Sequence, residues 1–340
     1  MSGPHFLASD EWADDEVLAV VARAAELKAG AARVPLSGRV LVGVFFDPSL
    51  RTRTSFEVAM ARHGGHMVVL EPGRGSWLIE TRPGAVMDGA AAEHLVEAAR
   101  VLGRYGDAVA VRAFPKAATW AEAREDAVVR GFAAHAGVPV VNLESARRHP
   151  CQGLADALTL REFVGPDLTG RKFVLSWAWH PKALPTAVPV SAAIAAARLG
   201  MEVVVARPEG FDLDPDDQAA IAAVAGRSGG SVTVTDDMDA ALSGADAVYA
   251  KSWGSLAFFG HPQQEAELRE PHHHWRIDER RMASTRGGRG IFMHCLPVRR
   301  NVVVTDGVLD GAWSVVVDQA ENRLWAQQAL LERLIGGGAA

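Results

Sequence analysis

Short apolar runs alternate with segments of helical periodicity along most of the chain. Apolar runs without polar alternation are typical of strands that are covered on both faces. In the first half of the chain, such runs predict strands at residues 40–46, 66–70, 108–112 and 138–142. Helical spacing of apolar positions predicts helices at residues 16–29, 52–62, 93–102 and 122–134.

The second half repeats this alternation, interrupted by a polar region at residues 263–289. Strands that alternate with helices in two series predict an α/β protein with two doubly wound parallel-sheet domains. We expect the domain boundary near residues 149–156. The predicted strands are residues 172–177, 202–207, 231–235, 247–251, 291–295 and 314–318, and the predicted helices are residues 186–198, 216–225, 238–242 and 322–335.

Composition narrows the class of protein. The chain has 340 residues, 49% of them hydrophobic, which is enough for two domains of ordinary size. The formal net charge is −6, so the chain lacks the excess of basic residues that would indicate a nucleic-acid partner. No apolar run reaches the roughly 18 residues of a membrane span. Two distant cysteines, Cys151 and Cys295, and the lack of a secretory segment at residues 1–13 predict a cytoplasmic protein.

The first candidate site follows the strand at residues 40–46, in the stretch FFDPSLRTRT. Ligands of parallel α/β sheets bind at the carboxyl ends of strands. Ser49 or Thr52 can cap the following helix, whose free N–H groups and dipole favour an anion, and Arg51 adds a forked cation suited to phosphate. An ordinary capped helix with exposed arginines explains the stretch equally well on its own. Arg53 is expected to form a structural ion pair.

Three more stretches carry cationic or amide groups at or near predicted strand ends. Arg112 ends a buried strand, where it needs an anionic partner or water. His149 and Gln152, in the stretch HPCQ, offer donors and acceptors for a planar carbonyl–amine group. The stretch HCLP at residues 294–297 ends another strand and precedes two arginines. None of these stretches offers a carboxylate pair or a set of metal ligands.

Three consecutive histidines, His272, His273 and His274, are the remaining candidates for a metal site. Consecutive side chains rarely converge on one ion, and no nearby cysteine completes a set of ligands. The sequence therefore favours a solvated loop at this point, and it predicts no metal site.

The motifs together resemble those of the aspartate/ornithine carbamoyltransferase superfamily. The phosphate motif SxRTR stands at residues 49–53, HPxQ at 149–152 and HCLP at 294–297. The resemblance covers nearly the whole chain and is closest to the N-acylornithine carbamoyltransferases, which act on N-acetyl- or N-succinyl-L-ornithine. Marks of that branch are FFDPSLRTRTSFE, GSWLIE, VMDG, VRAFPK, WHPKALPTAV and YAKSWGS. The SMG motif of ordinary ornithine carbamoyltransferases is absent, and KSWGS stands at what looks like the comparable strand end.

The resemblance implies a domain order and an assembly. A carbamoyl-phosphate-binding domain would occupy residues 1–148, and the C-terminal segment, residues 322–340, would return to pack on it. An amino-acid-binding domain for the N-acylornithine would occupy residues 149–321. Trp77 would reach into the site of a neighbouring subunit, which implies a homotrimer.

The resemblance also implies a reaction, in which the δ-amine of an N-acyl-L-ornithine attacks carbamoyl phosphate and phosphate leaves. This step in arginine biosynthesis would need no metal, cofactor or covalent intermediate. The Leu296–Pro297 peptide bond is expected to be cis. The implied catalytic residues are Arg112, His149, Gln152 and Cys295. The residues implied for carbamoyl phosphate are Ser49, Leu50, Arg51, Thr52, Arg112, His149, Gln152, Leu296 and Arg323, and those implied for the N-acylornithine are Trp77, Ala92, Glu144, Lys251, Cys295 and Arg299.

Three positions depart from the family pattern and concern the second substrate. The N-acetyl branch has a glutamate after MDG and a lysine after RRN, whereas this chain has Ala92 and Val303. The N-succinyl branch is apolar at both positions. Ala92 removes a like-charge repulsion towards a succinyl carboxylate, although it adds no cation. Val190 replaces an amide residue of the family. We expect N-succinyl-L-ornithine as the substrate, with N-acetyl-L-ornithine, or use of both, as the alternative.

Other interpretations remain open. An ordinary ornithine carbamoyltransferase and a non-catalytic family member would both keep the fold, although the intact phosphate, HPxQ and Arg112 positions argue against a decayed site. A nucleotide-binding oxidoreductase is disfavoured, because no GxGxxG follows the first strand of either series. Cys295 is also consistent with a buried core cysteine, and Glu144 with a local cap or ion pair.

Overall fold

The computed structural model describes residues 5–337 and divides the chain into two compact units. The first unit comprises Met1–Ala117, Ala121–Cys151 and Arg323–Ala340, and the second comprises Ala118–Trp120 and Gln152–Asn322. Residues 1–4 and 338–340, which the sequence assigns to the first domain, lie outside the described residues. Two helices, α6 (Pro150–Phe163) and α13 (Val316–Ile335), continue from one unit into the other.

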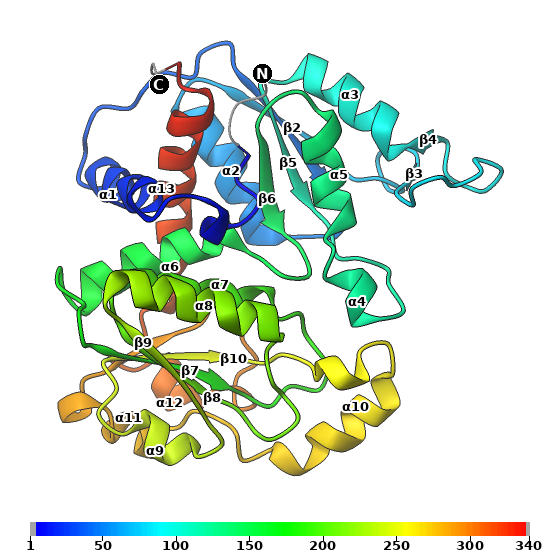
Figure 1. Cartoon of the computed structure of the whole chain (residues 1–340). Coiled ribbons are helices and arrows are strands. Elements are labelled where there is room, and N and C mark those ends of the chain that lie inside the picture. The colour runs from blue at the N-terminus through cyan, green and yellow to red at the C-terminus, as the bar shows by residue number, and fades with distance from the viewer. Residues whose placement is uncertain (1–4, 338–340) are drawn as a thin grey trace. The chain divides into compact units, whose positions relative to one another are not determined.

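The first unit is built around a parallel sheet with the strand order β2-β1-β5-β6 (Figure 1). β1 and β5 are buried along almost their whole length, as expected from their continuous apolar sequences. The strand order reverses between β1 and β5, so a ligand site is expected at the carboxyl ends of these two strands. The strands are β1 (Val40–Phe45), β2 (His66–Leu70), β5 (Ala108–Arg112) and β6 (Val140–Glu144), and the helices are α1 (Asp14–Lys28), α2 (Leu50–Arg62), α3 (Leu95–Tyr105), α5 (Ala127–His135), the short η1 (Ser9–Glu11) and the end of α13.

A small lobe extends from the first unit before α3 (Figure 1). Its two short strands, β3 (Ile79–Glu80) and β4 (Glu93–His94), pair in parallel. Exposed large apolar side chains concentrate on this segment: Trp77, Leu78, Val86 and Met87 are 62%, 45%, 75% and 43% exposed. Such a concentration is typical of a surface that another protein chain covers.

The second unit contains a five-stranded parallel sheet with the order β11-β10-β7-β8-β9. Its order reverses between β7 and β10, so the ends of these strands are again the expected ligand position. Among residues 5–337, no helix combines the length and apolar character that a membrane span requires. The strands are β7 (Lys172–Trp177), β8 (Glu202–Ala206), β9 (Ser231–Thr235), β10 (Ala247–Lys251) and β11 (Ile291–Met293), and the helices are α7 (Ala187–Arg198), α8 (Pro215–Ser228), α9 (Met238–Leu242), α10 (Pro262–Arg269), α11 (Glu279–Ala283), α12 (Asp306–Leu309), η2 (Leu256–Phe258), η3 (Glu270–His272) and η4 (Arg286–Gly288).

Two sequence predictions of secondary structure are wrong. Residues 314–318 do not form a strand: Ser314 makes an isolated bridge to Phe292, and α13 already begins at Val316. The helix predicted at residues 122–134 is broken into α4 (Trp120–Ala123) and α5, because Asp126 takes a left-handed backbone conformation between them. The predicted polar region at 263–289 folds into short helices.

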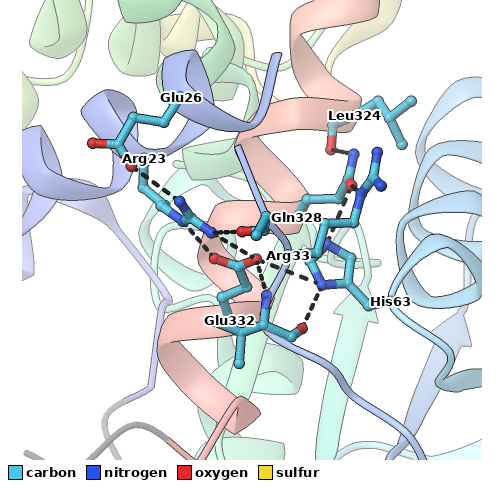
Figure 2. Close-up of polar contacts among 9 residues, drawn as sticks. Arg23, Glu26, Arg33, His63, Leu324, Gln328 and Glu332 are labelled. Atoms are coloured by element: carbon cyan, nitrogen blue, oxygen red, sulfur yellow. Dashed lines mark hydrogen bonds and ion pairs between the residues drawn. The ribbon is translucent and has the colours of Figure 1, made fainter. Parts of the chain in front are cut away.

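A polar cluster holds the end of α13 within the first unit (Figure 2). The Glu332 carboxylate accepts hydrogen bonds from Nε of Arg23, on α1, at 2.7 Å and from the backbone N–H of Val34 at 2.9 Å. The ring nitrogens of His63, at the end of α2, lie 2.8 Å from the Val34 carbonyl and 3.1 Å from Oε1 of Gln328. The cluster therefore ties α13 to three segments from the first part of the chain.

Candidate active-site residues

The helix that follows β1 presents its N-terminus at the carboxyl edge of the first sheet. The Ser49 hydroxyl caps α2 by accepting a hydrogen bond from the backbone N–H of Thr52 at 3.2 Å. Leu50 is 78% exposed, Arg51 is half-buried, and Thr52 is buried. The Thr52 hydroxyl accepts a hydrogen bond from Nη2 of Arg323, on α13, at 2.7 Å. Three residues expected to hold phosphate therefore form one bonded group at a helix N-terminus, a position that favours anions.

Arg53, the second arginine of the motif, forms ion pairs away from this group. Its Nε lies 3.1 Å from the carboxylate of Glu57, one turn further along α2, and its Nη1 lies 3.5 Å from that of Glu71. The predicted structural ion pair of Arg53 is confirmed.

Arg112, Glu144 and His149 form a mostly buried group at the same edge of the sheet. Pairing of β5 with β6 sets Arg112 opposite Glu144, and the guanidinium makes an ion pair with the Glu144 carboxylate. Nε2 of His149 lies 3.5 Å from the same carboxylate oxygen. The three side chains are 12%, 14% and 4% exposed, so water screens these charges weakly. The local ion pair considered for Glu144 is present, and its carboxylate contacts both of the donors expected to be catalytic.

The two groups lie at the ends of neighbouring strands. Phe45, at the end of β1, pairs in register with Arg112, and the backbone N–H of Phe46 donates to the Arg112 carbonyl at 2.9 Å. This is the point where the strand order of the sheet reverses. The first unit therefore places a guanidinium, an imidazole and helix N–H groups at the edge where α/β proteins bind ligands.

Trp77 and Ala92 both lie on the projecting lobe. The indole N–H of Trp77 donates to the carboxylate of Glu93 at 2.7 Å, and the backbone N–H of Ala92 donates to the Leu78 carbonyl at 3.2 Å. The lobe thus brings together the aromatic residue expected to reach a neighbouring subunit and the residue expected to face the acyl group.

Cys151 is a structural thiol. It is fully buried in the first unit, and its Sγ donates to the backbone carbonyl of Asn142 at 3.8 Å. Burial raises the pKa of the thiol to about 12, so it stays protonated and unreactive at neutral pH.

In the second unit, buried hydrogen bonds connect Gln152 to the segment that contains HCLP. Nε2 of Gln152 and Nε2 of Gln319 donate to the same oxygen of Asp156, at 2.8 and 2.6 Å. Oε1 of Gln319 accepts from the backbone N–H of His294 at 2.9 Å. Nδ1 of His294 in turn accepts from the backbone N–H of Leu296 at 2.9 Å. This chain of bonds fixes Gln152 relative to Leu296, the two residues expected to orient the carbamoyl amine.

The HCLP segment has unusual backbone geometry and a buried cysteine. The Leu296–Pro297 peptide bond is cis, as expected, and Leu296 has a φ of 54°. Cys295 is 8% exposed and belongs to the apolar core of the second unit, next to Tyr249. Burial raises the pKa of Tyr249 well above its ordinary value, with the charges of Asp156 and Cys295 acting in the same direction. Cys295 is therefore a buried core cysteine, which is one of the two interpretations that the sequence allowed.

The charges of Lys251 and Arg299 both act on one histidine of the second unit, His180. Lys251 ends β10, where it pairs in register with Trp177 at the end of β7. Nε of Arg299 donates to Nε2 of His180 at 2.9 Å. Burial lowers the pKa of His180, and the positive charges of Arg299 and Lys251 lower it further, which favours the neutral ring that this hydrogen bond requires.

Val190 and Val303, two positions that depart from the family pattern, are both buried in the apolar core of the second unit. The histidine triplet agrees with the expected solvated loop, because His273 and His274 lie in a turn and are exposed. The ring of His273 stacks on Trp179 with centroids 3.9 Å apart, and His272 meets the edge of Trp177 at 6.2 Å. In the part of the chain that the structure describes, no group of three or more His, Cys, Asp or Glu side chains is arranged to hold a metal ion.

Sequence reasoning assigned no role to Asp156, Gln319 or His180. Asp156 and Gln319 are far apart in the sequence, and only the fold shows that they share a hydrogen bond. His180 carried a signal, because it stands in the stretch WHPK directly after a buried strand, where a parallel sheet places its ligand-binding side chains.

Comparison with protein families gives matches over both units. The carbamoyl-P binding domain of the aspartate/ornithine carbamoyltransferases matches residues 4–162. The Asp/Orn binding domain of the same family matches residues 185–334.

Individual relatives are similar over nearly their full length. The N-acetylornithine carbamoyltransferase of Xanthomonas campestris pv. campestris is 48% identical over 338 residues, which are 99% of each chain. The N-succinylornithine carbamoyltransferase of Bacteroides fragilis is 37% identical over 298 residues, which are 87% of each chain.

Solved structures share the fold and contain ligands of this chemistry. An acetylornithine transcarbamylase in complex with acetylcitrulline has a TM-score of 0.93 at 48% identity, over 97% of this chain and 98% of that one. A glutamate-to-alanine mutant of N-acetyl-L-ornithine transcarbamylase, with the same TM-score, was solved with carbamyl phosphate and N-succinyl-L-norvaline. The chain therefore belongs to the aspartate/ornithine carbamoyltransferase family of enzymes.

Proposed function

We propose that the enzyme transfers the carbamoyl group of carbamoyl phosphate to the δ-amine of an N-acyl-L-ornithine, which yields an N-acyl-L-citrulline and phosphate in arginine biosynthesis. The observation that carries this proposal is the donor set at the carboxyl ends of β1, β5 and β6: the capped N-terminus of α2 and the Arg112–Glu144–His149 group. The similarity to N-acylornithine carbamoyltransferases over the whole chain supports it.

The proposed roles follow the charges that develop in the reaction. The neutral δ-amine attacks the carbamoyl carbon, the bond from carbon to the phosphate oxygen breaks, and the departing phosphate takes up the proton that the amine loses. Ser49, Leu50, Arg51, Thr52 and Arg323 would hold the departing phosphate. Arg112 and His149 would stabilise charge on the carbonyl oxygen, since preorganised donors act mainly by electrostatics. Gln152 and the Leu296 carbonyl would orient the carbamoyl amine, and the residues proposed to face the N-acylornithine are Trp77, Ala92, Glu144, Lys251, Cys295 and Arg299.

The proposed acyl group is N-succinyl, with N-acetyl as the second candidate. Ala92 carries no charge to repel a succinyl carboxylate. The glutamate-to-alanine mutant of the N-acetyl-L-ornithine enzyme that was solved with N-succinyl-L-norvaline supports this choice. The higher identity to N-acetylornithine carbamoyltransferases, 48% against 37%, favours N-acetyl. Overall identity reflects the whole chain, whereas an acyl group contacts few side chains.

A carbamoyl transfer assay with ornithine, N-acetyl-L-ornithine and N-succinyl-L-ornithine tests the proposal. We expect citrulline-type product from both acylated amines, a higher kcat/KM for the succinyl compound, and little product from ornithine. Product from ornithine alone would overturn the N-acyl assignment. Lack of product from all three amines, in a protein that binds carbamoyl phosphate, would indicate a non-catalytic family member.

The lobe that carries Trp77 is proposed to contact a second copy of the chain within a homotrimer. The exposed Trp77, Leu78, Val86 and Met87 support this proposal, because a monomer would leave all four in water. Light scattering during gel filtration should give three times the chain mass of 36.2 kDa. A monomer with full activity would contradict the proposal.

A further inference from the structure

The turn between Glu144 and His149 is held by a carboxylate that the proposed chemistry does not use. Asp126 precedes α5 and is 8% exposed. Its two carboxylate oxygens accept hydrogen bonds from the Ser145 hydroxyl at 2.7 Å and from the backbone N–H of Ala146 at 3.0 Å. These are the two residues that directly follow Glu144.

Other bonds close the same turn around Ser145. The backbone N–H of Ser145 donates to the carbonyl of Arg148 at 3.0 Å. The side-chain amide of Asn142 donates to the Ser145 hydroxyl at 3.0 Å and to the Leu7 carbonyl at 2.9 Å. The turn therefore has a fixed shape, and its ends are the residues whose side chains meet at 3.5 Å, Glu144 and His149.

The backbone of Asp126 indicates that its side chain is needed at this place. Asp126 has φ 49° and ψ 38°, a left-handed conformation that is unfavourable for most residues and that Asp and Asn adopt more readily. Burial raises the pKa of Asp126, while the bonds from Ser145 and Ala146 and the charges of Arg130 and Arg147 favour its ionised form. Asp126 thus combines a strained backbone with a buried carboxylate, and its two hydrogen bonds to the turn offset these unfavourable features.

We propose that Asp126 is a positioning residue for carbamoyl transfer: it fixes the turn that sets the His149 imidazole against the Glu144–Arg112 pair. The proposal rests on the proposed function, because it assigns Asp126 a part in presenting the donors of that reaction. An error of about 1 Å in the place of a catalytic group can cost on the order of 10²-fold in rate.

Two substitutions distinguish the effect of the two hydrogen bonds from the effect of the backbone conformation. Asp126→Gly removes both bonds and suits the left-handed backbone, whereas Asp126→Asn keeps the shape and an acceptor for Ala146. Asp107→Gly is the matched control, because the Asp107 carboxylate likewise accepts one side-chain and one backbone hydrogen bond, from Arg39 and Val40, at the opposite ends of β1 and β5. Ser145→Ala, which removes one of the two bonds, is the second test if Asp126→Gly does not fold.

The measurements are steady-state kinetics of the full-length variants and hydrogen exchange of the Ala146 amide. We expect Asp126→Gly to lower kcat by about 10–100-fold with a smaller change in KM for carbamoyl phosphate. Asp126→Asn should stay within about threefold of the wild type, since the hydrogen bonds to the turn persist. Ala146 should lose protection in Asp126→Gly and keep it in Asp126→Asn.

Two outcomes would overturn the proposal: a folded Asp126→Gly variant with the kcat of Asp107→Gly, or an Asp126→Asn variant no more active than Asp126→Gly. If Asp126→Gly does not fold, a Ser145→Ala variant with wild-type kcat and wild-type protection of Ala146 would overturn it as well. A wild-type enzyme without carbamoyl transfer would contradict the proposed function instead, so the two failures are distinguishable.

Discussion

His149→Ala should lower kcat for carbamoyl transfer by on the order of 10²–10³-fold, the usual cost of losing one preorganised donor. His149 is almost fully buried, and its Nε2 faces the Glu144 carboxylate. Its removal leaves the Arg112–Glu144 ion pair in place, so the fold should persist. Steady-state kinetics and circular dichroism of the purified variant check this result.

The matched control is His66→Ala, which removes an exposed histidine at the amino end of β2 and should leave kcat unchanged. Near-normal turnover in His149→Ala would contradict the catalytic assignment. Equal losses in the two variants would indicate a general effect on the protein rather than on the reaction.

Arg112→Ala should lose at least as much activity, but the structure adds an expectation about stability. The substitution leaves the mostly buried Glu144 carboxylate without its guanidinium, and breaking a buried ion pair typically costs about 3–5 kcal/mol. A double variant, Arg112→Ala with Glu144→Gln, should recover much of the stability and none of the activity. Urea unfolding and kinetics of the same preparations separate the two effects.

Ala92→Glu should lower kcat/KM for N-succinyl-L-ornithine by at least about tenfold, since 1.4 kcal/mol of like-charge repulsion is sufficient for that factor. For N-acetyl-L-ornithine, which lacks the second carboxylate, the change should be small. The substitution should therefore reverse the proposed preference between the two substrates. Competition between both amines in one reaction measures the ratio directly.

Ala92→Gln is the control for this experiment, because glutamine has nearly the size of glutamate and no charge. If Ala92→Gln impairs the succinyl substrate as strongly as Ala92→Glu, the selection depends on space and not on charge. A wild-type enzyme that prefers the N-acetyl substrate would show that Ala92 alone does not decide the acyl group.

The sheets were predictable because most of their strands are apolar throughout. Strands such as β1, β5, β7 and β10 are buried on both faces, and their sequences show it. Helix α6 was missed for the related reason that most of its residues are buried, so it lacks the polar face that reveals an amphipathic helix. Residues 314–318 have an apolar sequence that suits a strand, but the chain continues there into α13.

The candidate site was predictable where its residues are neighbours in the sequence. The cap by Ser49 and the ion pair of Arg53 depend on helix spacing, which the sequence contains. The contact between Arg112 and Glu144 depends on the register of two strands, and the bond from Gln319 to Asp156 depends on the fold of the second unit. No local pattern encodes such contacts, so only the structure reveals them.

The return of α13 to the first unit has a consequence for the order of synthesis. The segment that begins at Arg323 is translated after the strands of both sheets, yet Arg323 bonds Thr52. Glu332, in the same segment, bonds Arg23 (Figure 2) and the backbone N–H of Val34. The first unit, whose synthesis begins before that of the second, is therefore completed only after the second unit has been translated. Until then, the nascent chain carries the α2 N-terminus without the arginine that fixes Thr52, so the proposed phosphate-binding group forms only after Arg323 has left the ribosome.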